Sequence, residues 1–379
     1  MIAAVASSVS EHRFGSSEPY TLGIEEEYML LDPATLELVQ RADTVLEADG
    51  AGEFAARTSC ELFQSVIEGQ TPICSTVDDA DRELRRMRRH LEQVVARYGL
   101  VLASSGTHPF AHYEDQLITE RDRYRSVIEQ IQYPARRELI FGLHVHVGVP
   151  DPETAIQVVR LLGPHIPELI ALSASSPFWR GFATGLYSTR HSVFATFPRS
   201  RTPPPFSDYD EFSAYVRALE LAGALDDYTK IWWDVRPHPR LGTVEVRAMD
   251  AVARVEDAIA LAAYVQALVR RAVEAAPLPR PTALEEALAR ENKWQAIRYG
   301  LEAVTITANE GPLPIRKAIL RTLEELAVDA AALGSEAAIA EIEQISRRGT
   351  GAERQLATFA ATGDVRAVAQ QIVTETASS

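Results

Sequence analysis

The chain has 379 residues, of which 46% are apolar and 24% are charged, a composition typical of a soluble globular protein with a full hydrophobic core. Its formal net charge is −15, which disfavours a general nucleic-acid-binding surface because such surfaces are basic. No apolar run approaches about 18 residues, so we expect no membrane-spanning helix and no membrane partner.

The chain is expected to work in a reducing cytoplasm. Its two cysteines, Cys60 and Cys74, form neither a disulfide framework nor a CxxC pair. The N-terminal residues lack the charged start and long apolar core of a signal peptide, and we expect 1–18 to form a flexible tail. No low-complexity linker divides the remainder, so 19–379 is predicted to be a single domain.

In chain order, the first part predicts strands around one long helix. Apolar residues at steps of three and four predict a helix over 78–98, with acidic residues near its start and Gly99 after its end. We interpret the arginines of this helix as a solvated basic face. The expected strands cover 20–31, 58–70, 100–110 and 138–150, and the helical arginines are Arg85, Arg86, Arg88 and Arg89.

The second part moves from strands to helices. A helical, apolar stretch over 152–175 precedes a long irregular segment, 176–210, and loops of that length in a compact domain are often functional. Two strands broken by a Pro-rich turn are expected over 230–250. Because strands and helices do not alternate regularly, the fold class is α+β rather than a doubly wound sheet. Residues after 252 are expected to be helical, with breaks at 277–281, 311–314 and 347–351.

The first predicted strand carries adjacent carboxylates in the segment GIEEEY. Strand alternation places Glu25 and Glu27 on one face and Glu26 on the other. Same-face glutamates can share a hard cation such as Mg²⁺ or Mn²⁺. An exposed edge strand that carries charges to block aggregation explains the same residues equally well.

Three further segments repeat this pattern of polar residues on one face of a strand. In 58–70, Glu68 is the expected inward ligand, whereas Glu61 falls on the opposite face unless a bulge intervenes. His144 and His146 project together, which is a familiar spacing of metal ligands. Glu245 and Arg247 also share a face, as a structural ion pair or as neighbours of a metal and a phosphoryl group.

These residues together predict an antiparallel sheet whose concave face is lined with ligands for more than one divalent ion and a nucleotide triphosphate. The chain has no GxxxxGK[ST] loop and no GxGxxG that opens a helix, so P-loop and Rossmann nucleotide sites are excluded. ATP would therefore bind through metals that bridge its phosphates and through scattered arginines.

The chain resembles the type 2 glutamate–cysteine ligases, also called YbdK-like carboxylate–amine ligases, over about residues 20–375. The motifs GIEEEYMLLD, ELFQSVIEGQTP, ASSGTHPF, GLHVHVGV, GTVEVRAMD and ENKWQAIRYGL occur in the order of that family. The resemblance implies a six-stranded, curved antiparallel sheet with helices outside, of the glutamine-synthetase-like ligase architecture. It also implies a single catalytic domain, a homodimer, and an amide bond formed between amino-acid or amine substrates, such as glutamate and cysteine, through an acyl phosphate.

The resemblance also implies roles for particular residues. Glu27 and Arg247 would be catalytic, with Arg247 on the transferred phosphoryl group. Substrate contacts are expected of His108, His146 and Arg180, although a hydrogen-bonded turn also explains His108. The metal ligands would be Glu25, Glu27, Glu68, His144 and Glu245, and the residues around the ATP cofactor Arg190, Asn292 and Arg298.

Two other functions fit part of this pattern. A metal-dependent amidohydrolase also uses paired histidines and carboxylates, but it calls for an α/β barrel with βα repeats along its length, which the helical last third does not provide. A ligand-binding homologue that has lost catalysis is the second. Stabilisation by Mg-ATP separates a ligase from a hydrolase.

Overall fold

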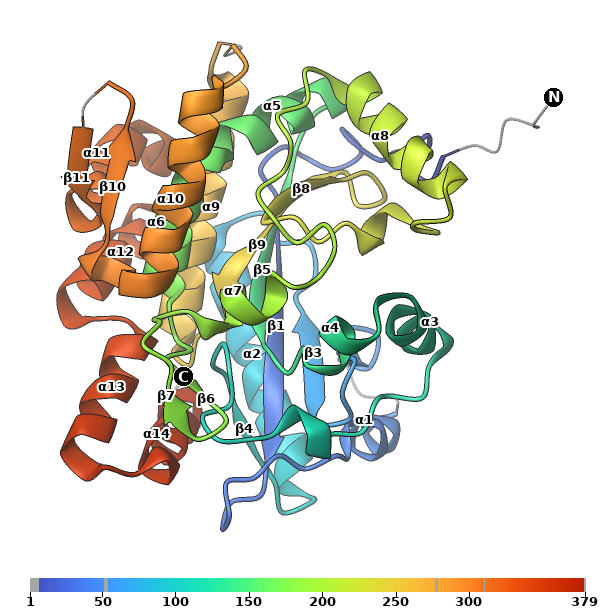
Figure 1. Ribbon diagram of the computed structural model, residues 1–379, viewed down its shortest axis with the longest axis vertical. Helices are drawn as coiled ribbons and strands as arrows, with labels where there is room; N and C mark the ends of the chain where they lie inside the picture. Colours follow the sequence, from blue (N-terminus) through green and yellow to red (C-terminus); the bar gives the residue numbers. More distant parts are fainter. Residues whose placement is uncertain (1–6, 51–53, 277–278, 310, 378–379) are drawn as a thin grey trace.

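The computed structural model describes residues 7–50, 54–276, 279–309 and 311–377, and an open antiparallel sheet lies at its centre (Figure 1). Its strands follow the order β2-β3-β1-β5-β9-β8, and β4 pairs with β1 to make the seventh. The α+β class and the sheet of about six strands are thereby confirmed. The bounds are β1 (Leu22–Leu31), β2 (Thr58–Cys60), β3 (Val66–Gln70), β4 (Val101–Ala103), β5 (Gly142–Gly148), β8 (Val235–His238) and β9 (Thr243–Asp250).

Helices cover one face of this sheet. On β1, Ile24 and Tyr28 point into the main hydrophobic core, while Glu25 and Glu27 point to the opposite face. The covering layer consists of α2 (Val77–Ala96), α5 (Pro152–Leu162) and α9 (Val255–Glu274). The other face carries Glu25 and Glu27 and, farther along β1, Met29 and Leu31 of a second hydrophobic cluster.

The remaining helices surround this centre. Helices α10 to α14, orange to red in Figure 1, gather on one side of the sheet. Their bounds are α10 (Ala283–Tyr299), α11 (Ile315–Leu333), α12 (Glu336–Arg348), α13 (Gly351–Thr362) and α14 (Val365–Ala377). The others are α1 (Ala42–Asp49), α3 (Asp122–Ile131), α4 (Tyr133–Arg136), α6 (Ile166–Ser173), α7 (Thr189–Phe194) and α8 (Tyr209–Leu221), with 3-10 turns at Tyr113–Asp115, Gly163–His165, Tyr228–Lys230 and Gly300–Glu302.

Two expectations about elements are wrong. The segment 58–70 is not one strand, because β2 and β3 form an antiparallel pair with a turn between them. The last third is not wholly helical, since β10 (Val304–Thr307) pairs with β11 (Gly311–Pro314). The irregular segment 176–210 contains α7 and a small hairpin of β6 (Phe178–Trp179) with β7 (Phe182–Ala183).

The described part of the expected N-terminal tail is packed rather than free. Val9 is fully buried, Phe14 joins the core, and the Ser8 N–H donates to the Glu220 carboxylate. Residues 1–6 lie outside the described part of the chain, so the expectation of a flexible tail fails for 7–18 only.

The interpretation of the α2 arginines as a solvated face is wrong at Arg88. This guanidinium is buried and pairs with Glu26 at 2.6 Å, on the core face of β1. It also donates to the Val252 and Ala253 carbonyls, and therefore connects α2 to the segment that precedes α9. A buried charge requires such partners, and a helical periodicity alone does not reveal them.

One helical stretch of the described residues, Pro152–Ser173, is long and apolar enough by composition to cross a membrane. In the protein, 67% of its most apolar window is buried. A core helix of a soluble protein meets the same criteria, so this stretch is weak evidence for a membrane span and is consistent with a soluble protein.

Candidate active site

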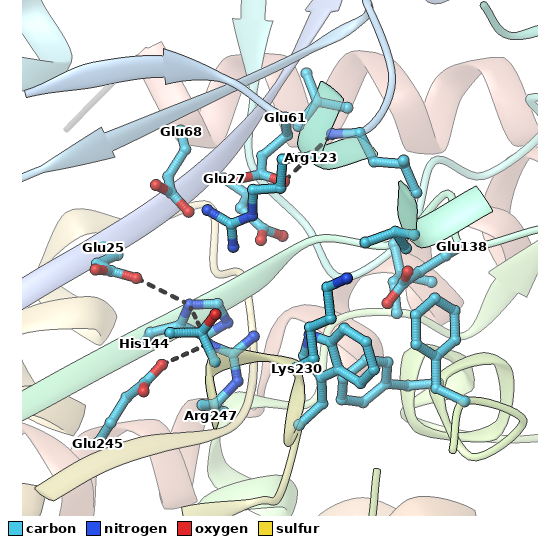
Figure 2. Close-up of a pocket in the computed structure, with 18 of the residues that line it drawn as sticks. Glu25, Glu27, Glu61, Glu68, Arg123, Glu138, His144, Lys230, Glu245 and Arg247 are labelled. Atoms are coloured by element: carbon cyan, nitrogen blue, oxygen red, sulfur yellow. Dashed lines mark hydrogen bonds and ion pairs between the residues drawn. The ribbon is translucent and has the colours of Figure 1, made fainter. Parts of the chain in front are cut away.

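A polar cavity of about 380 Å³ lies on the face of the sheet opposite α2 and α9. Strands β1, β3, β5, β8 and β9 contribute its floor, and Figure 2 shows acidic side chains from β1, β3 and β9 converging on it. The charged residues and histidines of its lining are Glu25, Glu27, Glu61, Glu68, Arg123, Glu138, His144, His146, Arg190, Lys230, Arg236, His238, Arg240, Glu245 and Arg247.

The register of the strands makes the ligand candidates direct neighbours. Glu27 lies opposite Glu68 on β3, and Glu25 lies opposite His144 on β5. His146 in turn lies opposite Glu245 on β9. Since directly opposed side chains in an antiparallel pair project to the same face, the sheet assembles residues from distant parts of the sequence.

Two overlapping groups in this cavity have the geometry of ion sites. One consists of Glu25, His144 and Glu245, and the other of Glu27, Glu68 and His144. Within each group one ligand atom of every residue lies within 4.8 Å of the others. Carboxylate oxygens with one imidazole suit Mg²⁺ or Mn²⁺.

His144 has a nitrogen to spare for a ligand. Its Nδ1 lies 3.3 Å from the Glu25 carboxylate, while its buried Nε2 has no hydrogen-bond partner among the described residues. A buried polar atom without a partner costs free energy, which a bound ion or substrate would recover. These donors therefore fit a divalent cation.

The carboxylates are held close together at an electrostatic cost. Burial raises the pKa of Glu68 well above its usual range, and the Glu25, Glu61 and Glu27 charges raise it further. Burial also raises the pKa of Glu27, although the neighbouring His144 acts to lower that pKa. Cations would relieve this repulsion, so the cluster is better suited to a metal-loaded state than to an empty one.

Glu245 has the opposite environment. It is buried, but the Arg236 and Arg247 guanidinium groups outweigh the effect of burial and hold its pKa well below the usual range. Arg236 donates to it through Nε at 2.6 Å, and Arg247 donates to its other oxygen. The Nε of Arg247 has no partner among the described residues and lies at the cavity, where it can contact an anion.

Arg190 reaches the cavity from α7, whose position depends on Asp250 at the end of β9. The Asp250 carboxylate accepts hydrogen bonds from the Ser176 and Ser188 hydroxyls, both at 2.7 Å. The Ser176 hydroxyl in turn accepts the Arg190 N–H at 3.1 Å. The buried Nε and Nη1 atoms of Arg190 have no partner in the described part of the structure.

The family model described as Glutamate-cysteine ligase family 2 (GCS2) matches residues 21–371. A protein of Rubrobacter xylanophilus named "Putative glutamate--cysteine ligase 2-1" is 43% identical over 355 residues, which cover 93% of this chain and 94% of that protein. A protein of Herpetosiphon aurantiacus named "Putative glutamate--cysteine ligase 2" is 41% identical over 363 residues, 94% of this chain and 93% of its own length. The chain belongs to glutamate–cysteine ligase family 2.

Solved structures agree with GCS2 membership at the level of the fold. The glutamate–cysteine ligase of Francisella tularensis in complex with AMP superposes with a TM-score of 0.70 at 13% identity, over 96% of this chain and 90% of that one. A bifunctional glutathione synthetase of Pasteurella multocida gives the same TM-score and identity over 95% of this chain and 52% of that one. This GCS2 protein is therefore a carbon–nitrogen ligase with the glutamate–cysteine ligase fold.

The structure brings together most of the GCS2 site residues expected from the sequence. All the predicted metal ligands and Arg247 line the cavity, as do Arg190 and His146. Glu61 lines it as well, which corrects the expectation that it faces away: the turn after β2 reverses the chain before β3 begins. The roles of these residues remain predictions.

Four predicted residues lie outside the described lining of the cavity. The His108 Nε2 lies 2.9 Å from the Leu36 carbonyl, and its Nδ1 accepts hydrogen bonds from two backbone N–H groups. His108 is therefore the hydrogen-bonded turn residue that was the alternative to a substrate contact. Arg180 pairs with Glu114 at 3.1 Å. Asn292 binds both backbone groups of Ile306, and Arg298 donates to the Gly185 carbonyl.

Sequence reasoning missed Glu138, Lys230, Arg236 and His238 in this GCS2 cavity. Arg236 and His238 alternate along β8, a signal that strand periodicity could have revealed. Glu138 lies between α4 and β5, and Lys230 in a 3-10 turn, where no periodicity indicates which way a side chain points.

Proposed function

We propose that this GCS2 protein is an ATP-dependent carboxylate–amine ligase that forms an amide bond through an acyl phosphate. The observation that supports the proposal best is the pair of overlapping ligand groups that share His144, with Arg247 beside them. Phosphoryl transfer depends on neutralising and positioning charge, and this cavity concentrates groups that do both.

The proposed reaction has two steps. A substrate carboxylate oxygen attacks the γ-phosphorus of ATP, the bond to the β–γ bridging oxygen breaks, and ADP leaves. An amine then attacks the acyl carbon, the carbon–oxygen bond to phosphate breaks, inorganic phosphate leaves and the amine loses a proton. The energy of ATP is thereby used to replace a poor leaving group on the carboxylate with a good one.

In this proposal each group of ligands holds one Mg²⁺ or Mn²⁺. Glu25 and Glu245 would hold the first ion and Glu27 and Glu68 the second, with His144 as a ligand of one of the two. Bound ions supply charge neutralisation for the triphosphate and for the transferring phosphoryl group. The AMP bound to the Francisella tularensis glutamate–cysteine ligase supports the use of a nucleotide.

Arg247 and Arg190 are proposed to contact anionic oxygens. Arg190 is buried and Arg247 partly buried at the cavity, and each has a nitrogen atom that lacks a protein partner in the described chain. Arg247 would contact the transferred phosphoryl group and Arg190 another anionic group of the nucleotide or substrate. Planar, bidentate guanidinium groups suit both targets.

Neither cysteine is placed to act as a nucleophile in this cavity. Cys60 and Cys74 do not line it, and burial raises the pKa of their thiols to about 12 and about 11. Nucleophilic cysteines require the opposite shift. The proposed cytoplasmic location and homodimer are independent of this point.

The decisive experiment measures ADP release across a panel of carboxylates and amines, with L-glutamate and L-cysteine as the first pair, and identifies products by mass. The proposal expects ADP and an amide in equal amounts, only with divalent cation present. Hydrolysis of amides without ATP would favour the amidohydrolase, although the open antiparallel sheet already lacks the barrel that this alternative calls for. Nucleotide binding with no product would indicate a homologue that has lost catalysis.

A further inference from the structure

Glu138 is a carboxylate of the cavity that belongs to neither ion group. It lies in the short connection between α4 and β5, and its side chain lines the same space as Glu27 and Arg190. In the view of Figure 2 it stands across the cavity from Glu25 and Glu245, with its carboxylate directed into that space. The ligase site proposed above assigns no role to Glu138.

The neighbouring cations are occupied elsewhere or face other groups. The Lys230 ammonium binds the Ser126 hydroxyl at 3.0 Å, Gln130 at 3.1 Å and Asp226 at 2.9 Å. Arg190 directs Nη2 to the Arg247 carbonyl at 3.3 Å. Among the residues that the structure describes, none makes a hydrogen bond or ion pair with the Glu138 carboxylate.

The surroundings make an unpaired carboxylate costly. Burial raises the pKa of Glu138 well above its usual range, and the Glu27 and Glu61 charges add to the rise. Apolar and aromatic residues also line this cavity, among them Ile140, Phe194, Phe197 and Trp232. Glu138 is partly buried, and a carboxylate in such surroundings favours a cationic partner, which we expect to come with the substrate.

We propose that Glu138 is a substrate-binding residue that accepts hydrogen bonds from the ammonium group of an amino-acid substrate. Arg190 offers unpartnered nitrogens in the same cavity, so the pair presents both charges that a zwitterion requires. The proposal rests on the ligase function proposed above. The ammonium belongs either to the carboxylate donor or to the incoming amine.

The test compares amino acids with analogues that lack only the amino group. Isothermal titration calorimetry would measure L-glutamate against glutarate, and L-cysteine against 3-mercaptopropionate, on full-length protein with Mg²⁺ and a non-hydrolysable ATP analogue. Wild type should prefer the aminated probe of at least one pair by about tenfold to hundredfold, since hydrogen bonds to charged groups carry that weight. Glu138→Gln should abolish the preference, and the pair affected identifies the donor or the acceptor.

Glu129→Gln is the matched control, because Glu129 is exposed on α3 and lies outside the cavity lining. It should keep the preference of wild type, and melting curves should show that both variants fold. A wild type without any preference, or a Glu138→Gln variant that retains it in both pairs, overturns the proposal.

ADP release in the same preparations separates this inference from the ligase function. Normal amide formation with an unchanged preference would overturn only the role of Glu138. A preference that depends on Glu138, without ADP release for any carboxylate and amine, would overturn only the ligase function.

Discussion

At the scale of single residues, Glu27 combines several constraints. One of its oxygens accepts the Gly142 N–H at 2.6 Å, and its side chain lies opposite Glu68 across the strand pair. The carboxylate therefore has a fixed direction before any ion binds, at the expense of repulsion from its neighbours. Because a preorganised carboxylate is already oriented, binding an ion would cost it little further conformational entropy.

We expect Glu27→Gln to reduce ADP release by at least about a hundredfold, the loss typical of removing one preorganised electrostatic group. Without divalent cation the variant should melt at the same temperature as wild type or higher, because one repelling charge is gone. Thermal melting with and without Mg²⁺, beside a turnover assay, checks both parts. Wild-type turnover would mean that β1 carries ordinary surface charge.

His108 gives a pH prediction away from the ion sites. Burial lowers its pKa from the usual 6.5 to about 4. Between pH 6.5 and pH 4, His108 binds a proton in the unfolded chain but stays neutral in the folded protein. The free energy of unfolding therefore falls as the pH drops through this range, and the loss approaches about 3 kcal/mol.

The variant His108→Asn keeps an acceptor for the turn but does not titrate there. Denaturant unfolding at pH 7 and pH 4 should show wild type losing about 3 kcal/mol more than this variant. An equal loss in both proteins would mean that His108 is protonated in the fold, as an exposed substrate contact would be.

Residue-level sequence reasoning succeeded where strand alternation holds. It placed Glu25 and Glu27 on the face opposite Glu26, and paired His144 with His146, because β1 and β5 are regular strands. It failed for Glu61 because the two-residue alternation of a strand does not reveal the turn that follows β2. It could not find Glu138, since only the tertiary position of an irregular connection brings that side chain to the cavity.

At the scale of elements, the buried pair of Glu26 and Arg88 joins β1 to α2 on the side away from the cavity. Both side chains are only 1% exposed, and the Tyr28 hydroxyl also donates to Glu26. The same strand thus fixes its position through one glutamate and presents two others to the cavity.

We expect Arg88→Met to destabilise the protein by about 3–5 kcal/mol, because it leaves the buried Glu26 charge without a cationic partner. Adding Glu26→Gln should recover a large part of that loss. Arg89→Met, on the exposed side of the same helix, is the control and should stay within about 0.5 kcal/mol of wild type. Chemical denaturation measures all four proteins, and a small effect of Arg88→Met alone would contradict the buried-pair account.

The segment 176–210 was predicted from the sequence as irregular and functional, and its internal anchoring came only from the structure. Buried residues fix its start and α7, whereas Arg201 is exposed beyond them. We expect trypsin to cut the free protein after Arg199 or Arg201, and Mg-ATP to slow the cut by ordering the segment around the ligand. Equal cleavage rates would rule out a closing role.

For the molecule as a whole, one hydrophobic cluster contains residues from Val9 to Ile345 and a second contains residues from Met29 to Val373. The single catalytic domain stays a prediction. Composition and element order were sufficient to predict the α+β class. The resemblance of ordered motifs predicted the sheet and the family. The position of the β10–β11 pair depends on long-range packing, which neither source reveals.

The acidic balance of the molecule leads to a prediction about divalent cations. Because the folded protein concentrates carboxylates that the unfolded chain disperses, Mg²⁺ should raise the melting temperature more than NaCl of equal ionic strength. Saturation at about 100 times the dissociation constant corresponds to about 2.7 kcal/mol. A chelator should reverse the shift, and Glu27→Gln should reduce it; identical effects of both salts would indicate screening alone.

The hydrogen bonds of Asp250 allow the loop between Ser176 and Ser188 to vary in length without disturbing the core. Ser176 and Ser188 bind the same carboxylate, so the chain between them leaves the core and returns to it at one point. Its tip at 181–183 is exposed, and lengthening a surface loop costs little, about 0.6 kcal/mol for each doubling. Relatives could therefore exchange this loop for longer or shorter ones while Arg190 keeps its position at the cavity.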